Sequence, residues 1–341
     1  MAWSFACPPA LDAERDDTGP ADVDNTFVEP AMQPIITAMR AASARATGQP
    51  VTPEQMRLRA ALQFAYWNRQ PPVLAQVRDL DIPTGRGVRR ARWYDPDGRL
   101  QAPLLLYLHG GGWVLGDLDI EDRALRTLAL ESGAKIVSLD YRLAPEHPFP
   151  AAIEDTVTAF AWLRRHAQEL GGSARALALG GASAGADIAL AAALRLRDED
   201  LPLPAQLLLF YGVYGVDRNT ESDRLFGTPE FSGPLANMEL FYASYAGSPE
   251  RRRNPLVAPL LADLKGLPPT FLNAAGIDPL RDDSRQLHDR LRQSGVPVRY
   301  WEYPGVVHGF TQFTLTSATA RKALADAGAA IRSRLAGAAL T

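Results

Sequence analysis

The apolar positions of this chain fall into short runs that are separated by longer amphipathic stretches. Short runs bounded by Gly, Pro or polar residues are typical of strands, and continuous ones of strands covered on both faces. The pattern predicts eight strands, at residues 77–82, 88–94, 103–109, 134–139, 176–179, 205–211, 269–274 and 298–303. The first two strands flank a Pro-Thr-Gly-Arg-Gly turn and are expected to form an antiparallel hairpin.

Most of the remaining chain has apolar residues at helical spacing or a composition that favours helices. Helices are predicted at residues 30–46, 53–68, 120–131, 149–170, 186–197, 237–245, 280–294 and 316–335. Thr52 is expected to cap the second of these helices, because Pro53 suits its first position. Strands that alternate with helices predict an α/β fold, with a mostly parallel eight-stranded sheet flanked by helices.

Two regions stand outside this alternation. Residues 1–75 have no strong strand pattern, but Met32, Ile35, Ile36 and Met39 recur at helical spacing, and Met56, Leu62, Phe64 and Tyr66 do so more loosely. Residues 215–259 are irregular, with one predicted helix, and are too long for an ordinary connection. We interpret both regions as segments that close over a site at the carboxyl ends of the strands.

Composition narrows the class of protein. Hydrophobic residues make up 46% of the chain, charged residues 22%, and the formal net charge is −3, which is ordinary for a soluble globular enzyme. No basic stripe predicts a nucleic-acid partner. The single cysteine, Cys7, excludes an intrachain disulfide and a cysteine-based metal site. Without a secretory signal pattern or an apolar run near the ~20 residues that span a bilayer, a cytoplasmic protein with no membrane span is expected.

The segment Gly181-Ala-Ser-Ala-Gly185 lies between a predicted buried strand and a predicted helix. In the context of a strand, a tight turn and a helix, the pattern G-x-S-x-G exposes a reactive serine. The start of the following helix offers free N–H groups and its positive dipole end to a developing oxyanion. The alternative is a turn of small residues in which Ser183 only caps the helix.

A serine hydroxyl is a poor nucleophile unless a base takes its proton. Among five histidines, His308 is the best candidate, because it lies in a loop after the last predicted strand. His166 and His288 lie in amphipathic helices and are interpreted as surface residues. His147 lies in a rigid Pro-flanked turn, and His109 is expected to fix the loop that follows it.

The base in turn needs a carboxylate that holds its tautomer and stabilises the imidazolium. Asp278 ends a predicted strand and is the preferred candidate, although it suits a helix N-cap equally well. Asp282 and Asp283 are rivals in the first turn of the next helix, where carboxylates favour the helix dipole. The chain order serine, aspartate, histidine is that of the α/β-hydrolases.

Three glycines follow the predicted strand 103–109, in His109-Gly-Gly-Gly-Trp113. Glycines let the backbone approach a ligand closely, so its N–H groups can face developing negative charge. A phosphate-binding loop is the alternative, but the chain has neither G-x-x-x-x-G-K-[ST] nor a G-x-G-x-x-G that opens a helix. Together with the Ala184 N–H, this loop would complete a site for acyl transfer.

Five motifs in order resemble the hormone-sensitive-lipase-like bacterial carboxylesterases of the α/β-hydrolase fold, from about residue 75 to the C-terminus. They are His109-Gly-Gly-Gly-Trp113, Asp140-Tyr-Arg-Leu-Ala-Pro-Glu-His-Pro-Phe-Pro150, Gly181-Ala-Ser-Ala-Gly185, Asp278-Pro-Leu-Arg-Asp-Asp283 and His308-Gly-Phe310. The chain departs from the usual family pattern beside the nucleophile, where Ala182 replaces an Asp and Ala186 replaces a Gly.

The resemblance implies a role for each motif. The implied nucleophile, orienting acid and base are Ser183, Asp278 and His308, and the implied oxyanion donors are the N–H groups of Gly111, Gly112 and Ala184. It also implies an N-terminal helical cap segment over residues 1–75 and an α/β-hydrolase catalytic domain over 76–341, with a cap insertion at about 215–259. No cofactor or metal is implied. Homodimers are common in the family, so a homodimer is a candidate assembly.

The sequence therefore predicts a serine carboxylesterase that hydrolyses short-chain acyl esters of small molecules through an acyl-enzyme. Trp113, Phe231, Phe241 and Tyr242 are candidates to line the substrate pocket, although each is equally typical of a core. Two alternatives stay open. One is a hydrolase of amides, carbamates or lactones on the same site, and the other is a non-catalytic ligand-binding member of the fold.

Overall fold

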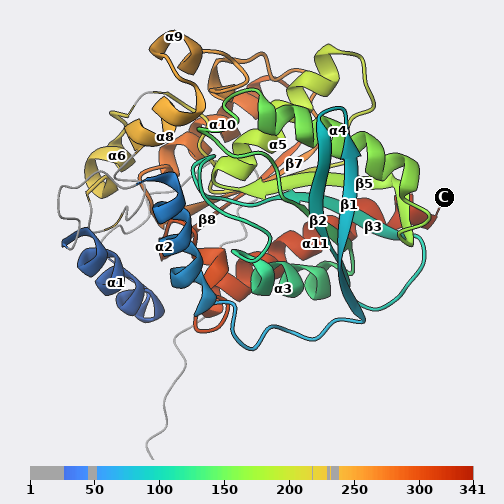
Figure 1. Ribbon diagram of the computed structural model, residues 1–341, viewed down its shortest axis with the longest axis horizontal. Coiled ribbons are helices and arrows are strands. Elements are labelled where there is room, and N and C mark those ends of the chain that lie inside the picture. Colours follow the sequence, from blue (N-terminus) through green and yellow to red (C-terminus); the bar gives the residue numbers. More distant parts are fainter. Residues whose placement is uncertain (1–26, 45–51, 217, 229–230, 232–237, 341) are drawn as a thin grey trace, which may run out of the picture.

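A computed structural model describes residues 27–44, 52–216, 218–228, 231 and 238–340. Its centre is an eight-stranded sheet with the order β1-β2-β4-β3-β5-β6-β7-β8 (Figure 1). The strands are β1 (Gln76–Thr84), β2 (Gly87–Asp95), β3 (Ala102–Leu108), β4 (Lys135–Leu139), β5 (Gly172–Ala182), β6 (Leu207–Phe210), β7 (Thr270–Ile277) and β8 (Val298–Val307). All eight predicted strands are confirmed.

The sheet is mostly parallel, as predicted. Only two pairs are antiparallel, the predicted β1–β2 hairpin and the neighbouring β2–β4 pair. The pairs from β4 through β3 to β8 all run parallel. Parallel strands end at the same edge of a sheet, so the loops after β3, β5, β7 and β8 are brought together there.

Helices cover both faces of the sheet, because side chains of a strand alternate between them. Leu104, Leu106 and Leu108 pack in one cluster with α4, α5 and α10, whereas Leu105 and Tyr107 pack in the other with α3 and α11. Figure 1 shows these two helix layers above and below the sheet. The helices are α3 (Asp122–Ser132), α4 (Ala151–His166), α5 (Ala184–Asp198), α10 (Arg281–Gln293) and α11 (Ala318–Leu340).

The N-terminal part of the described chain is helical, as predicted. It contains η1 (Pro30–Met32), α1 (Gln33–Ala44) and α2 (Pro53–Ala65). The predicted cap of α2 is confirmed, since Thr52 and Gln55 bond each other's backbone N–H groups. The apolar stripe of α1 is buried. The stripe predicted on α2 is only partly correct, because Leu62 and Tyr66 are exposed.

The insertion contains more helix than the one predicted at 237–245. That helix is present as α8 (Met238–Tyr245), and it is accompanied by α6 (Glu221–Phe226), α9 (Pro249–Arg252) and η3 (Pro259–Leu261). Helices α6 and α9 are short, and the side chains of the preceding residues, Thr220 and Ser248, cap them. In Figure 1, α1, α2, α6 and α8 lie toward the same side of the molecule.

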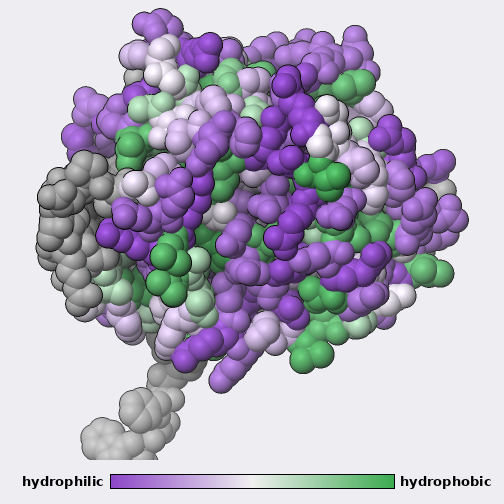
Figure 2. Space-filling view, viewed as in Figure 1, coloured by the Kyte–Doolittle hydropathy of each residue, from purple (hydrophilic) through white to green (hydrophobic). Residues whose placement is uncertain are grey.

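The visible surface is mostly hydrophilic, and its hydrophobic side chains form small separate groups (Figure 2). None of the helices in the described ranges combines the length and the apolar character needed to cross a membrane. Cys7 lies outside the described residues.

Candidate active site

Ser183 lies at the sharp turn between β5 and α5. Its φ of 54° and ψ of −120° place it in a strained region of backbone space, as a serine presented by such a turn requires. The flanking glycines are needed for space, because a Cβ on Gly185 would lie 2.0 Å from the Leu108 carbonyl oxygen and one on Gly181 2.5 Å from it. The Ser183 side chain makes no capping hydrogen bond, so the alternative of a simple N-cap is wrong.

The hydroxyl of Ser183 instead contacts His308, in the loop after β8. His308 Nε2 lies 2.9 Å from Ser183 Oγ, and Nδ1 lies 2.7 Å from Asp278 Oδ2. Asp278 follows β7 and is completely buried, and its Oδ1 accepts the backbone N–H of Leu280 at 2.8 Å. One carboxylate oxygen therefore bonds the backbone just before α10, and the other bonds the His308 imidazole. The three predicted residues form one continuous chain of hydrogen bonds.

The rival carboxylates have other partners. Asp282 Oδ2 accepts the N–H of Ser222, and Asp283 Oδ2 accepts the N–H groups of Tyr214 and Gly215 at 2.8 and 2.9 Å. Burial raises the pKa of Asp283, while hydrogen bonds and the nearby Arg218 oppose that shift. Both carboxylates therefore attach the insertion to α10, and neither orients His308.

The other histidines are not part of this chain. His109 is buried, with Nδ1 2.8 Å from the Gly110 carbonyl oxygen and its ring stacked on Tyr141, which agrees with the expected loop-fixing role. The prediction that His288 is a surface residue is wrong, because only 3% of it is exposed. Its Nδ1 lies 3.0 Å from Asp289 Oδ1. The sequence carried this signal, since His288 shares helical spacing with the buried positions 284, 287 and 291.

The glycine loop lies against the serine turn. Gly111 and Gly112 have φ values of 126° and 61°, and a Cβ on Gly112 would lie 2.8 Å from the Phe241 ring. The N–H of Gly110 donates to Glu121 Oε1 at 2.9 Å. Within the described part of the chain, the N–H groups of Gly111, Gly112 and Ala184 donate to no acceptor. Each of the three N–H groups predicted to bind an oxyanion is therefore unpaired in the described structure.

Glu121 is a feature of the site that the sequence did not reveal. It lies at the start of α3, is only 2% exposed, and receives hydrogen bonds from Gly110 N–H and from the Tyr107 hydroxyl at 2.6 Å. Burial raises the pKa of this carboxyl, and the two hydrogen bonds oppose that shift. In the sequence Glu121 resembles an ordinary acidic residue near a helix start, and nothing local indicates burial.

The four candidate pocket residues differ in their surroundings. Trp113, Phe241 and Tyr242 are almost fully buried, whereas Phe231 is half-buried and contacts Phe226 edge to face. Trp113 Nε1 donates to Asp187, and the Tyr242 hydroxyl donates to the Gly215 carbonyl oxygen. Of the four, Phe241 is the one packed against Gly112.

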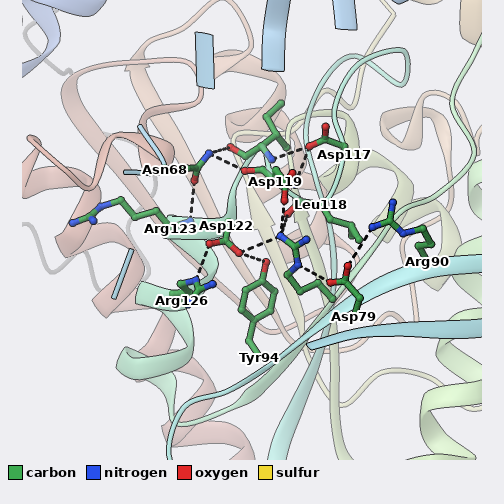
Figure 3. A network of polar contacts seen from close by, with 12 residues as sticks. Asn68, Asp79, Arg90, Tyr94, Asp117, Leu118, Asp119, Asp122, Arg123 and Arg126 are labelled. Carbon is green, nitrogen blue, oxygen red and sulfur yellow. Dashed lines mark hydrogen bonds and ion pairs between the residues drawn. The ribbon is translucent and has the colours of Figure 1, made fainter. Parts of the chain in front are cut away.

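The segment that follows the glycine loop is attached to α2. Arg57 donates from Nε to the Val114 carbonyl oxygen at 2.8 Å and pairs with Glu146 at 2.6 Å. Figure 3 shows a second attachment, in which Asn68 donates to the Asp119 carbonyl oxygen and accepts the Arg123 N–H. The described residues contain no group of three or more side chains suited to hold a metal ion.

Comparisons with known proteins identify the family of this chain. A sequence model of the alpha/beta hydrolase fold family matches residues 105–312, which is more than half of the chain. The chain is 35% identical to an acetyl esterase of Salmonella schwarzengrund over 276 residues, which cover 80% of this chain and 84% of the relative. The acetyl esterase of Salmonella choleraesuis matches to the same extent.

Solved structures extend the likeness to three dimensions. A thermophilic carboxylesterase cloned from a metagenomic library is 36% identical, with a TM-score of 0.80 and coverage of 84% of this chain and 98% of that one. A hyperthermophilic esterase from Pyrobaculum calidifontis is 31% identical, with a TM-score of 0.80 and coverage of 90% and 98%. By sequence and by architecture, and in agreement with the family resemblance of its motifs, the chain belongs to the alpha/beta hydrolase fold family.

Proposed function

We propose that this carboxylic ester hydrolase is a serine esterase for short-chain acyl esters, with Ser183 as its nucleophile. The observation that carries the proposal is the hydrogen-bonded series from Ser183 Oγ through His308 to Asp278. The strained backbone of Ser183 supports it, because such strain is concentrated at functional positions. The similarity to proteins named acetyl esterase supports a short acyl group.

The geometry supports a two-step reaction. His308 Nε2 takes the Ser183 proton as Oγ attacks the ester carbonyl, while the free N–H groups of Gly111, Gly112 and Ala184 hold the oxyanion. The tetrahedral adduct collapses, and His308 gives the proton to the departing alcohol. A water then loses a proton to His308 and attacks the acyl-enzyme, which releases the acid and restores the serine. Asp278 accepts the hydrogen bond from His308 Nδ1 and stabilises the imidazolium in both steps.

The cap and the pocket belong to the same proposal. We assign residues 1–75 and about 215–259 to a cap over the catalytic domain of residues 76–341. Arg57 of α2 and Asn68, which lies three residues after the end of α2, attach the first of these segments beside the glycine loop. Phe241, from the insertion, contacts Gly112 and is therefore the best-supported pocket residue. A homodimer through β8 would use the outer edge of that strand, which among the described strands pairs only with β7. The Glu29 N–H already donates to the Gly305 carbonyl oxygen on β8, so the rest of the strand would form the contact. Location in the cytoplasm stays a prediction.

The test is hydrolysis of p-nitrophenyl esters from acetate to dodecanoate by the wild type, Ser183→Ala and Ser132→Ala. We expect activity to peak at short chains and kcat to fall about 10⁴-fold or more in Ser183→Ala. Ser132 is an equally buried serine that bonds the Leu128 carbonyl oxygen within α3, so its variant controls for the lost hydroxyl. An inactive wild type, or full activity in Ser183→Ala, would refute the proposal and direct attention to amides or lactones.

A further inference from the structure

A buried hydrogen bond joins the glycine loop to the helix that follows Ser183. Trp113 Nε1 donates to Asp187 Oδ2 at 2.9 Å, although the residues are far apart in the chain. Trp113 is 1% exposed and Asp187 is completely buried. A bond between two side chains in a low-dielectric interior is costly to break, because each polar group would be left without a partner.

On one side, the bond holds the residue directly after Gly111 and Gly112. Trp113 has a φ of 62°, a conformation that non-glycine residues seldom adopt and that its surroundings must maintain. Its indole stacks on Tyr245 of α8, with ring centroids 4.7 Å apart and planes 1° from parallel. Its carbonyl oxygen accepts the Ala144 N–H at 2.9 Å. The loop position is therefore fixed by the Trp113 side chain and backbone together.

On the other side, the bond holds the first turn of α5. Asp187 lies four residues after Ser183, and its own N–H donates to the Ser183 carbonyl oxygen at 3.2 Å. Ala184, whose N–H is the third free donor, begins the same turn. The other Asp187 oxygen, Oδ1, has no hydrogen-bond partner in the part of the chain that the structure describes. Among the described residues, the Asp187 side chain therefore forms a single hydrogen bond, with Trp113.

We propose that Asp187, acting through Trp113, is a positioning residue that fixes the two halves of the oxyanion hole relative to each other. The inference rests on the proposed function, which assigns one half to Gly111 and Gly112 and the other half to Ala184. Oxyanion donors act when they lie about 2.7–3.1 Å from the developing charge, and a misplacement of about 1 Å can cost about 10²-fold in rate. A bond that ties the two halves together therefore acts on the transition state more than on substrate binding.

The test compares Asp187→Leu, Asp187→Asn, Trp113→Phe and the double variant Trp113→Phe/Asp187→Leu in hydrolysis of p-nitrophenyl acetate. Asp187→Leu is expected to lower kcat about 10- to 100-fold and to change KM by less than about threefold. Asn keeps an acceptor for the indole and should restore most of the loss. The double variant should be no slower than the slower single variant, because both remove the same bond.

A second readout is the affinity for a methyl trifluoromethyl ketone, which adds to the serine and forms an oxyanion. Its dissociation constant should rise in Asp187→Leu by about the same factor as kcat/KM falls, as expected of a transition-state analogue. Titration of Ser183 with a fluorophosphonate counts the folded sites, so kcat is expressed per competent molecule. Tyr94→Phe, which removes a buried hydroxyl bond to Asp122, is the matched control and should keep kcat within about twofold of wild type.

The outcomes separate this inference from the proposed function. If Asp187→Leu keeps the wild-type kcat per folded site, or if only KM rises, the bond is merely structural and the inference is wrong. If Asn restores nothing, a role through the indole bond is equally refuted. If the wild type is inactive or Ser183→Ala retains activity, the proposed function itself fails.

Discussion

Glu121 Oε1 accepts the backbone N–H of Gly110, the glycine that lies against Ser183 and directly precedes Gly111 and Gly112. Because the Gly110 N–H is paired with Glu121, it cannot donate a hydrogen bond to a substrate. This bond also fixes the peptide from which Gly111 and Gly112 extend. A buried carboxylate thereby determines which way the loop presents its remaining donors.

Replacement of this carboxylate should disturb the loop. Glu121→Leu leaves Gly110 N–H and the Tyr107 hydroxyl buried without an acceptor, which costs about 1–3 kcal/mol for each group. We expect kcat/KM to fall at least tenfold, whereas Glu121→Gln keeps an acceptor for Gly110 and stays within about fivefold. Steady-state kinetics and denaturant unfolding measure both effects. Tyr107→Phe is the control, since it removes the second bond and leaves Gly110 paired; equal losses in Leu and Gln variants would contradict the prediction.

Asp187 should make stability depend on pH. Burial raises the pKa of its carboxyl well above the exposed value of about 3.9, although the Trp113 bond lowers it in part and Asp283 raises it further. The folded chain then keeps a proton on Asp187 that the unfolded chain releases. The contribution of Asp187 to stability is therefore complete below the pKa of the unfolded state, and it is lost as pH rises toward the pKa of the folded state. The difference in free energy of unfolding between wild type and Asp187→Asn isolates this effect. As pH rises, wild type should lose up to about 1.4 kcal/mol per pH unit relative to the variant. Urea unfolding between pH 5 and 8 measures it; a flat difference would refute the raised pKa.

The choice between Asp278 and Asp282 can be tested by one pair of variants. Asp278→Asn should lower kcat by about 10³- to 10⁴-fold, because the amide favours the wrong tautomer of His308. Asp282→Asn should leave kcat within about threefold, since that carboxylate bonds the Ser222 N–H instead. The two proteins are compared by kcat for p-nitrophenyl acetate after their folding is checked by circular dichroism. A large loss in Asp282→Asn alone would reverse the assignment.

The attachment of α2 should matter for activity. Arg57→Ala removes the donor to the Val114 carbonyl oxygen, while the Val114 and Leu115 N–H groups donate to Gly111 O. The loosened loop should lower kcat/KM about tenfold, or ~1.4 kcal/mol of transition-state stabilisation. Arg59→Ala is the matched control, because Arg59 is an exposed arginine on the same helix. Esterase assays on both variants test this, and equal kcat/KM values would show that α2 does not support the loop.

The sequence was sufficient to predict the positions that strand order brings together. Ser183, Asp278 and His308 each follow a predicted parallel strand, and such strands end at one edge of the sheet, so their proximity follows from the topology. The apolar runs likewise predicted all eight strands. Those of β3, β4, β6 and β7 are continuous because these strands are buried along their whole length, whereas the mostly exposed β1 was indicated by the turn that joins it to β2.

Residues whose role depends on packing were harder to predict. Glu121 and Asp187 lie at helix starts, where acidic residues are common for their effect on the dipole, so their burial could not be inferred locally. The same holds for Trp113, whose indole bonds a carboxylate from a distant segment. The short helices α6 and α9 depend on capping and on contacts with α10 or α8 more than on periodicity. His288 is different, because its helical spacing with buried neighbours was visible in the sequence.

His308 is delivered by the loop after β8, the last strand of the sheet in chain order, whereas the glycine loop follows β3. Synthesis proceeds from the N-terminus, and folding follows it. The ribosome therefore releases Ser183 and the glycine loop well before His308, the proposed base. If the proposed function is correct, a nascent chain, or a product truncated ahead of His308, carries an inert hydroxyl. Ester hydrolysis thus reports only molecules whose synthesis has passed the final strand.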